Sequence, residues 1–582
     1  MPTRFRPMPR RTVRLLRLPL ARISTHIGQA TSRVPLLRRS SAGRNSSPCT
    51  ACKQAVARRR AQCALASPTF PWLFGLLAVF LFHTVASAAD QPQWGRRYSR
   101  NMVSEEKGLP DCFDPKSGKN IKWTAALGTQ CFATPVVAGG RVFIGTNNGE
   151  PRDAKHVGDR GVLLCLNEAD GSLAWQLVTP KLAEDIYLDW PEAGMCSPPT
   201  VEGDRVYALT NQTEVVCLDL NGMANGNDGP FRDEGRHMSP PEDPPMQAGP
   251  TDADILWRLD LRTAAGVHPH DSSHSAILLD GQYLYVNTSN GVNNKHQAVA
   301  APEAPALVVV DKNTGRLVAM EREGISRRLV HGTWSSPALG EVSGKRLVFF
   351  GGPDGVCYAF DAMASSEAVE QSAQTATTEA AAPVDSLHRV WRFDCDPTSP
   401  KVDIHRYMGN RQESPSNIKS MVVFDHGRIY VTAGGDIWWG KKQAWLKCID
   451  ATRTGDITES GLVWSYSIAH HCVSTPSIQD GLIYVADCGG EVHCVDAETG
   501  KPCWTHDVRG EIWASTLVAD GKIYVGTRKG DFWILAAGRE KRVLSSVRLD
   551  DPVISTAIAA NGVLFVGTMT HLYAVQEGAK RP

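Results

Sequence analysis

The chain has 582 residues, with 62 basic and 61 acidic side chains and a formal net charge of +1. This length exceeds one ordinary hydrophobic core, so it requires several domains or a repeat architecture. The charge is uneven: residues 1–89 hold 14 Arg, one Lys and no acidic residue, which leaves 47 basic against 61 acidic residues. An acidic main body argues against a nucleic-acid partner.

The first 89 residues have the layout of a secretory signal peptide. Three arginines, Arg58 to Arg60, precede an apolar run at residues 71–82, and Ala86-Ser87-Ala88 forms a small-x-small cleavage site. The apolar run is short for a bilayer span. We therefore expect a basic leader over residues 1–89 that is cleaved, with an uncleaved membrane anchor at residues 71–82 as the alternative. The mature domain, residues 90–582, is then periplasmic or secreted.

From residue 90 onward, short Val-, Ile- and Tyr-rich runs alternate with turns that contain Gly and Pro. One pattern returns along the chain, most clearly at residues 494–504 (CVDAETGKPCW) and, with the same offsets, at residues 165–175 (CLNEADGSLAW). A repeat of this size, built only from strands and turns, predicts radial β repetition, that is, a β-propeller.

Counting the repeats in chain order gives eight. Two copies, at residues 309–319 and around residues 542–544, have lost the tryptophan that ends the motif. Six copies keep it, at Trp123, Trp175, Trp257, Trp391, Trp464 and Trp504. The pattern predicts an all-β fold, an eight-bladed propeller of four-stranded blades. Because residues 121–123 have no unit before them, we expect this N-terminal strand to pair with the strand containing Tyr573 and close the last blade.

The residue types of the motif have physical reasons. The tryptophan fits the wedge between blades and can donate its indole N–H to a carbonyl, and the glycine suits a positive-φ turn. Equivalent positions in different blades lie too far apart for a disulfide. We therefore interpret the cysteines at the small position of the motif as buried apolar residues: Cys165, Cys217, Cys448 and Cys494. Eight further cysteines after the leader leave one or two disulfides open, with undetermined pairing.

Two insertions interrupt the regular spacing of the repeats. Residues 223–253, rich in Asn, Gly, Asp and Pro, extend the second blade. Residues 362–387 have a low-complexity, Ala-rich composition that predicts disorder.

The repeats resemble those of the pyrroloquinoline-quinone (PQQ) propeller superfamily, whose docking motif is Ala-x-Asp-x-x-Thr-Gly-x-x-x-Trp. The copy that ends at Trp504 matches with Cys in place of Ala, and the copy that ends at Trp175 also departs at Asn167 and Asp170. The resemblance covers roughly residues 91–577 and implies a ring like that of the quinoprotein alcohol dehydrogenases. The superfamily also includes BamB-like propellers, which bind proteins and no quinone, and the chain is similar to PQQ-like propellers of planctomycete-type bacteria.

The resemblance implies two alternative functions. The sequence has neither the adjacent cysteine pair of the quinoprotein alcohol dehydrogenases nor a Cys-x-x-Cys-His haem site. Their calcium is held by carboxylate and amide oxygens, for which Glu413 and Asn417 are candidates, with Trp334 as a further cofactor-binding candidate. We favour a binding or assembly module of the cell envelope. The alternative is an oxidoreductase that uses PQQ and a divalent cation such as Ca²⁺ on alcohols or sugars.

Histidines gather just before the predicted inner strands. On a propeller these segments surround one mouth of the central channel, and His and Cys are transition-metal ligands. The candidate metal cluster consists of His268, His270, His331, His405, His471 and Cys472. The alternative is that each histidine caps its own loop. We expect a monomeric ring whose partner is an envelope protein or a small ligand in the channel.

Overall fold

The computed structural model describes residues 89–364 and 383–580. The predicted leader, with its apolar run at residues 71–82 and its cleavage site, lies outside these ranges, as does most of the insertion at 362–387. Within the described ranges, none of the helices has the length and apolar character needed to cross a membrane.

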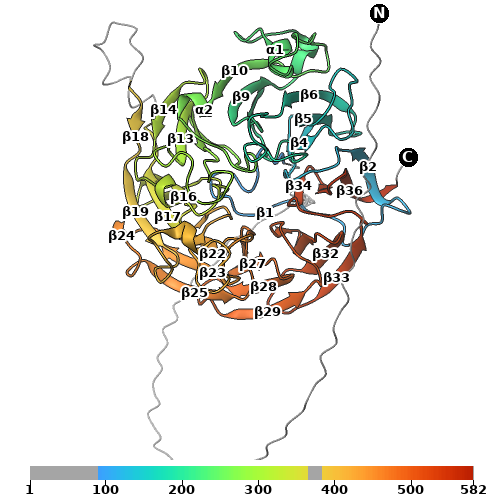
Figure 1. Ribbon diagram of the computed structural model, residues 1–582. Helices are drawn as coiled ribbons and strands as arrows, with labels where there is room; N and C mark the ends of the chain where they lie inside the picture. The colour runs from blue at the N-terminus through green and yellow to red at the C-terminus, as the bar shows by residue number, and fades with distance from the viewer. Residues whose placement is uncertain (1–88, 365–382, 581–582) are drawn as a thin grey trace, which may run out of the picture. The chain divides into compact units, whose positions relative to one another are not determined.

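The described residues form eight separate sheets of four or five strands. Figure 1 shows them side by side around a central axis, so the predicted eight-bladed propeller is confirmed. Within each blade consecutive strands pair antiparallel, which meets the backbone hydrogen-bonding requirement locally. Buried aliphatic residues from neighbouring blades form the hydrophobic clusters between the sheets.

The first four blades, each given from its inner to its outer strand, follow one another along the chain. They are β3 (Val136–Ala138), β4 (Arg141–Asn147), β5 (Arg160–Asn167) and β6 (Leu173–Pro180); β7 (Thr200–Glu202), β8 (Arg205–Leu209), β9 (Glu214–Asp219) and β10 (Ile255–Asp260); β11 (Leu278–Asp280), β12 (Tyr283–Asn287), β13 (Leu307–Asp311) and β14 (Leu317–Met320); and β15 (Ala338–Val342), β16 (Lys345–Gly351), β17 (Val356–Asp361) and β19 (Arg389–Asp394).

The last four blades follow in the same order. They are β21 (Val423–Asp425), β22 (Arg428–Gly435), β23 (Ala444–Asp450) and β25 (Leu462–Ile468); β26 (Ser477–Gln479), β27 (Leu482–Ala486), β28 (Glu491–Asp496) and β29 (Pro502–Asp507); β30 (Leu517–Ala519), β31 (Lys522–Gly526), β32 (Asp531–Ala536) and β33 (Val543–Arg548); and β34 (Ile558–Ala560), β35 (Val563–Gly567), β36 (His571–Lys580) and β2 (Lys119–Ala126).

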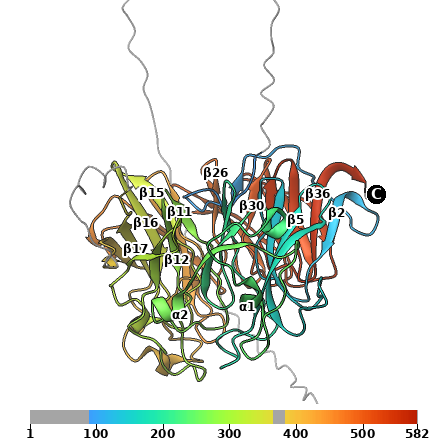
Figure 2. The same cartoon turned by 90° about the horizontal axis from the view of Figure 1, so that it is seen from above.

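Short additional elements extend the sheets or lie in loops. Four of them are strands: β1 (Val103–Ser104), β18 (Asp385–Ser386), β20 (Ser416–Asn417) and β24 (Gly455–Asp456). The helices are α1 (Glu234–Met238) and α2 (Leu261–Ala264), with 3₁₀ turns at Gly222–Asn225, Ser326–Arg328 and Ile404–Tyr407. Figure 2 shows α1 and α2 on the same face of the ring.

The ring is closed by the N-terminal strand, as predicted. β2 pairs antiparallel with β36, with Trp123 opposite Ala574 and Thr124 opposite Tyr573. The last blade therefore combines one strand from near the start of the described chain with three from its end. This pairing leaves no open edge between the first and the last blade.

All six predicted docking tryptophans link their blade to the next. Each indole Nε1 donates a hydrogen bond of 2.9–3.2 Å to a backbone carbonyl of the following blade, at Glu168, Leu220, Lys312, Ala451, Ala497 and Gly538. At four of these contacts a glycine of the next motif lies against the indole, at Gly171, Gly222, Gly315 and Gly500: a Cβ on Gly315 or Gly500 would lie 2.5 Å from a ring carbon. The small residue of the motif is the cross-strand partner of the tryptophan, as Cys494 is of Trp504.

The cysteines at the small position are buried, as predicted: Cys165, Cys217, Cys448 and Cys494 are at most 1% exposed. None of the twelve cysteines within the described ranges is in a disulfide, so the disulfides that the sequence left open are not formed there.

The two insertions behave differently. Residues 223–253 lie between β9 and β10 of the second blade, as predicted, and contain α1. The prediction of disorder is wrong at the far end of the second insertion, because β18 pairs parallel with β14 and Leu387 is only 4% exposed. Burial of Leu387 fixes this segment, whereas residues 365–382 lie outside the described ranges.

A feature that the sequence did not indicate is a segment, residues 89–113, that we call the N-terminal strap. It forms hydrogen bonds with residues in or beside the innermost strand of every blade: Val137, Val201, Ile277, Leu339, Phe424, Ile478, Val518 and Ala559. Its strand β1 pairs parallel with β30 and lies near the centre of the ring in Figure 1. The strap thus adds contacts to all eight blades.

Arg100 is the most deeply buried polar side chain of the strap, with no exposed surface. Its guanidinium donates hydrogen bonds to the carbonyls of Trp94, Ala276, Ile277 and Pro337. Burial lowers the pKa of this guanidinium to about 9. One side chain therefore ties the strap to blades 3 and 4.

Candidate binding cavity and histidine cluster

The loops that lead into the innermost strands enclose a cavity of about 690 Å³ at one mouth of the channel. All eight blades contribute to its wall, and Trp94 of the strap lines it as well. Six tryptophans line it: Trp94, Trp190, Trp334, Trp438, Trp439 and Trp513. Trp190 and Trp438 remain 43% and 42% exposed. A concave, aromatic wall with a few polar groups is typical of a site for a small molecule.

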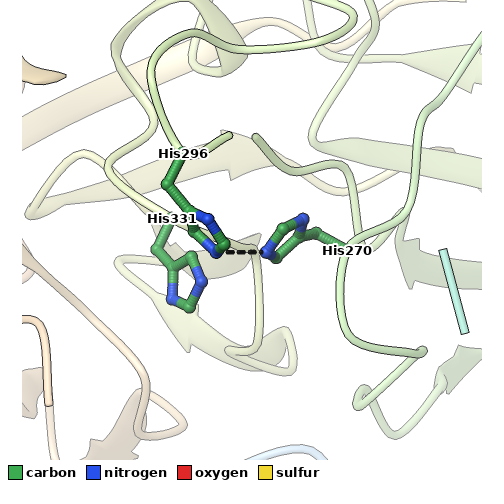
Figure 3. Close-up of side chains that lie close together, drawn as sticks. All are labelled: His270, His296 and His331. Atoms are coloured by element: carbon green, nitrogen blue, oxygen red, sulfur yellow. Dashed lines mark hydrogen bonds between the residues drawn. The ribbon is translucent and has the colours of Figure 1, made fainter. Parts of the chain in front are cut away.

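Three histidine side chains meet beside this cavity. His270, His296 and His331 each offer a ring nitrogen, and these nitrogens lie within 4.8 Å of one another. Figure 3 shows the three imidazoles converging from separate loops, with a hydrogen bond of 3.0 Å between Nε2 of His270 and Nε2 of His296. His270 and His331 are buried, at 1% and 2% exposure. Two of the residues, His296 and His331, face the cavity.

Backbone contacts hold the three loops together. Isolated bridges join Pro269 to Asn290 and Gly291 to Gly332, and the N–H of Val292 donates to the carbonyl of His331 at 3.0 Å. Gly291 is required for this approach, because a Cβ there would collide with Cβ of His270. The positions of the imidazoles therefore follow from main-chain packing.

The same loops contain strained backbone. Four residues other than glycine have positive φ there: Asp271 (66°), Ser272 (106°), Ser289 (58°) and His296 (55°). Such conformations cost of order 1–3 kcal/mol each and concentrate at functional sites. The strain and the histidine cluster therefore point to the same functional region.

Burial keeps the inner histidines neutral. Burial, together with the nearby His331 and His296, lowers the pKa of His270 to about 2. Burial, together with the nearby Lys419 and His331, lowers the pKa of His274 to about 3. A neutral imidazole keeps a lone pair for coordination, which is the form that binds metals.

Asp436 fixes one side of the cluster. Its Oδ2 lies 3.3 Å from Nδ1 of His331 and 3.2 Å from Nζ of Lys419. Its Oδ1 accepts the backbone N–H groups of Trp438 and Trp439. Burial disfavours the charged carboxylate, but Lys419 and His331 outweigh burial and hold the pKa of Asp436 well below its usual range. An ionised carboxylate therefore faces the outer nitrogen of His331.

The structure brings together two of the six residues of the predicted metal cluster. His270 and His331 come together, but the third member is His296, which the sequence did not indicate because it stands alone in the loop between β12 and β13. The thiol of Cys472 instead approaches the carbonyl of Ala486 at 3.1 Å, and burial raises its pKa to about 12. The remaining three predicted residues are half-buried in their own loops and are not members of the cluster: His268, His405 and His471.

The residues predicted to bind PQQ and calcium are separated. Trp334 lines the cavity, where Nζ of Lys419 lies 3.7 Å from the centre of its ring. Asn417 is buried and donates to Asp436, whereas Glu413 is exposed. Ca²⁺ takes six to eight oxygen ligands. The structure therefore does not bring the predicted oxygen donors of Glu413 and Asn417 together.

Comparisons with known proteins match the repeats of the ring. The family model described as "Outer membrane protein assembly factor BamB" matches residues 97–222 and 442–577. Among curated proteins, the quinohemoprotein alcohol dehydrogenase of Comamonas testosteroni is 28% identical over 108 residues, 16% of this chain and 15% of that protein. The 1-butanol dehydrogenase (cytochrome c) of Thauera butanivorans is 33% identical over 98 residues, 15% of this chain and 14% of that protein. The crystal structure of BamB from Moraxella catarrhalis has a TM-score of 0.45 at 13% identity, covering 79% of this chain and 98% of that one.

The repeated docking motif, the eight blades and the family match define the class. The family match, over 262 of the 582 residues, and the repeats support the superfamily of PQQ-like β-propellers. The matched region spans about one seventh of the length of the two curated dehydrogenases. For this chain, their activities are therefore proposals.

Proposed function

We propose that this protein is an exported binding module of the cell envelope, whose channel mouth holds a small, ring-containing molecule. The observation that carries the proposal is the cavity of about 690 Å³ with six tryptophans in its wall. Flat aromatic side chains stack on ring-shaped ligands and lose little conformational entropy when they do so. The exposed Trp190 and Trp438 offer such surfaces before any ligand arrives.

The test is a titration of the full chain, followed by tryptophan fluorescence and calorimetry. The probes are indole-3-carboxylate, a set of methyl glycosides and PQQ itself, without added metal. We expect saturable binding of at least one probe, weakened at least about tenfold by Trp438→Ala, because one lost aromatic contact is worth roughly 0.5–1.5 kcal/mol beyond its buried area.

The matched control is Trp445→Ala. Trp445 is a half-buried tryptophan on β23 that does not line the cavity. It should leave probe binding unchanged. If no probe saturates, or if both variants bind as the wild type does, the ring does not use this cavity for small rings. Retention of a protein partner by the same chain would then favour an assembly module.

A second candidate function is the oxidation of an alcohol or a sugar with PQQ and a divalent cation. It is favoured by the two dehydrogenases among the curated relatives and by Trp334 in the cavity wall. We assign no reaction step to this candidate, because the structure does not bring Glu413 and Asn417 together. Sustained dye reduction after addition of PQQ and Ca²⁺, over a panel of alcohols and sugars, would establish this function in place of the first.

The export part of the proposal is supported by the basic leader and the apolar run at residues 71–82. Residues 1–89 fused to alkaline phosphatase should give an enzyme that is active outside the cytoplasm, and the mature protein should begin at Asp90. A mature protein that still contains residues 71–82 would indicate the membrane anchor instead.

A further inference from the structure

We propose that His270, His296 and His331 bind a divalent transition-metal ion of the zinc class in the wall of the cavity, with Asp271 as a fourth donor. The proposal deepens the proposed function, on which its biological meaning rests, because Asp271, His296 and His331 line the cavity that is to hold the ligand. The residues that the family model matches, 97–222 and 442–577, include none of these four.

The separations between the donors suit one ion. Two ligands at about 2.1 Å from a tetrahedral zinc ion lie about 3.4 Å apart. Nε2 of His270 and Nε2 of His296 are 3.0 Å apart. The two oxygens of Asp271 lie 3.6 Å from Nε2 of His270 and 3.6 Å from Nε2 of His331. The ring nitrogens of the three histidines lie within 4.8 Å of one another, so side-chain movement is needed to bring all the donors to coordination distance.

A second observation in support of a metal is a buried ring nitrogen that has no hydrogen-bond partner. Nε2 of His331 has no hydrogen-bond partner within the described residues, although this side chain is only 2% exposed. Leaving a buried polar atom unpaired costs free energy, and native structures contain few such atoms. A metal bound at Nε2 would satisfy this atom at the point where it faces His270 and Asp271.

The surroundings of His331 have the form expected of a metal ligand. Histidines that bind metals usually direct their other ring nitrogen at a carboxylate, which fixes the tautomer and raises the basicity of the ligand. Nδ1 of His331 faces Oδ2 of Asp436 at 3.3 Å. Lys419 and two backbone N–H groups hold that carboxylate in place. A metal bound at Nε2 of His331 would therefore complete a carboxylate–histidine–metal arrangement in which Asp436 is the carboxylate.

The donor types indicate the class of metal. Imidazole nitrogens suit Zn²⁺, Cu²⁺, Fe²⁺ and Ni²⁺, whereas Ca²⁺ and Mg²⁺ require oxygen ligands. Three histidines and Asp271 complete a four-coordinate site, and a zinc site of this kind can expand to five ligands. A fifth ligand would arrive from the cavity, which Asp271, His296 and His331 line.

Two other groups of potential ligands in the described residues lie away from the cavity, although His156 in the first group also has buried ring nitrogens without a hydrogen-bond partner. In the group of Asp153, His156 and Asp252, the ammonium of Lys155 already pairs with Asp252. In the group around His493, Asp487 accepts the backbone N–H groups of its own loop at Gly489 and Glu491. The first group is an ion pair and the second a loop cap, so only the cluster at the cavity carries the proposal.

The experiment uses the full chain, purified without a polyhistidine tag and without chelator. Elemental analysis of the purified protein is followed by stripping and titration with Co²⁺, whose visible spectrum reports its coordination, and with Ca²⁺ as a comparison. We expect one equivalent of Co²⁺ with the spectrum of a tetrahedral or five-coordinate site, displaced by Zn²⁺ and unaffected by Ca²⁺.

Variants then locate the site. His296→Gln should weaken Co²⁺ binding at least about tenfold, whereas His471→Gln, at a half-buried histidine outside the cluster, should bind as the wild type does. His296 is the least buried of the three ligands, so its replacement is the least disruptive to folding. Equal binding by both variants, or no stoichiometric Co²⁺, overturns the proposal and leaves His331 as a bridge between two carboxylates.

X-ray absorption on the Zn²⁺-loaded wild type keeps the test independent of any variant. We expect three imidazoles at about 2.0–2.1 Å and no sulfur. A sulfur ligand or fewer than three imidazoles contradicts the assignment. The metal titration contains no organic probe and the probe titration contains no metal. Metal binding without probe binding therefore contradicts only the proposed function, and the reverse result contradicts only the metal site.

Discussion

At the scale of single residues, the glycine of a docking motif can have two roles, one in a turn and one in the docking of an indole. Gly500 has φ of +67°, and a Cβ there would lie 2.5 Å from Cδ2 of Trp464. Gly481 has φ of +72°, and an added Cβ would meet no atom within 4 Å. The first glycine permits both a turn and the docking of an indole, whereas the second permits only a turn.

This contrast gives a matched pair of substitutions. We expect Gly481→Ala to lower the free energy of unfolding by about 1–2 kcal/mol, the cost of a positive φ in an L-residue. Gly500→Ala should cost roughly 1–3 kcal/mol more, because the methyl group also overpacks the indole. Denaturant unfolding of the two variants measures the difference. Equal losses would mean that Trp464 moves aside freely and that the docking contact is weak.

The motif aspartate predicts a pH dependence. The ion pair with Arg539, together with the hydroxyl and N–H of Thr499, lowers the pKa of Asp496 to about 2. The folded-state pKa lies below the unfolded value of about 3.9. The stabilisation is therefore complete above about pH 4 and is lost as the pH falls toward 2. Because the pair is solvent-exposed, its contribution is on the order of 1 kcal/mol.

Asp496→Asn should therefore be less stable than the wild type at pH 7, and the difference should shrink between about pH 4 and pH 2. Unfolding midpoints at several pH values measure it. Arg539→Gln is the control, because it removes the ion pair and keeps the bonds from Thr499, so it should show a smaller loss. A difference that does not change with pH would contradict the assigned pKa.

At the scale of elements, the closing strand and the N-terminal strap stabilise the ring through different contacts. β2 completes the last blade through β36, whereas the strap contacts the inner strands of all eight blades. The sequence indicates β2 because Trp123 marks a repeat. It does not indicate the strap, which contacts the blades through backbone groups and through side chains such as Arg100 and Asn101, without a repeated motif.

A series of truncations separates the two. Removal of residues 1–88 should leave the melting temperature unchanged. Removal of residues 1–118 deletes the strap and should lower the melting temperature. Removal of residues 1–126 should lower the melting temperature further, because an unpaired edge of β36 is then exposed. Thermal unfolding measured by circular dichroism gives the order of the three melting temperatures. Identical melting of the last two proteins would show that β2 adds nothing once the strap is gone.

At the scale of the whole molecule, ring closure should determine how the protein unfolds. An open array of repeats can unfold from its ends, and its cooperativity depends on the contacts between neighbours. A closed ring has no ends. The described chain gives each blade two neighbours and a contact with the strap, so we expect a single cooperative transition for the intact ring.

The measurement compares circular dichroism with tryptophan fluorescence during denaturant unfolding. The two probes should coincide for residues 89–582 and separate for residues 127–582, with a smaller apparent m-value in the second case. Coincident transitions with equal m-values in both proteins would show that closure does not set the cooperativity.

The sequence by itself determined the blades, their number and their closure, because each depends on a local repeat: a small residue, a positive-φ glycine and a tryptophan at fixed spacing. Only the tertiary structure determined which residues meet at the candidate site. The loops of His270, His296 and His331 are distant in sequence and share no motif, and they meet because main-chain bridges and Gly291 bring them together. For the same reason Glu413 and Asn417, which are close in sequence, end in different surroundings.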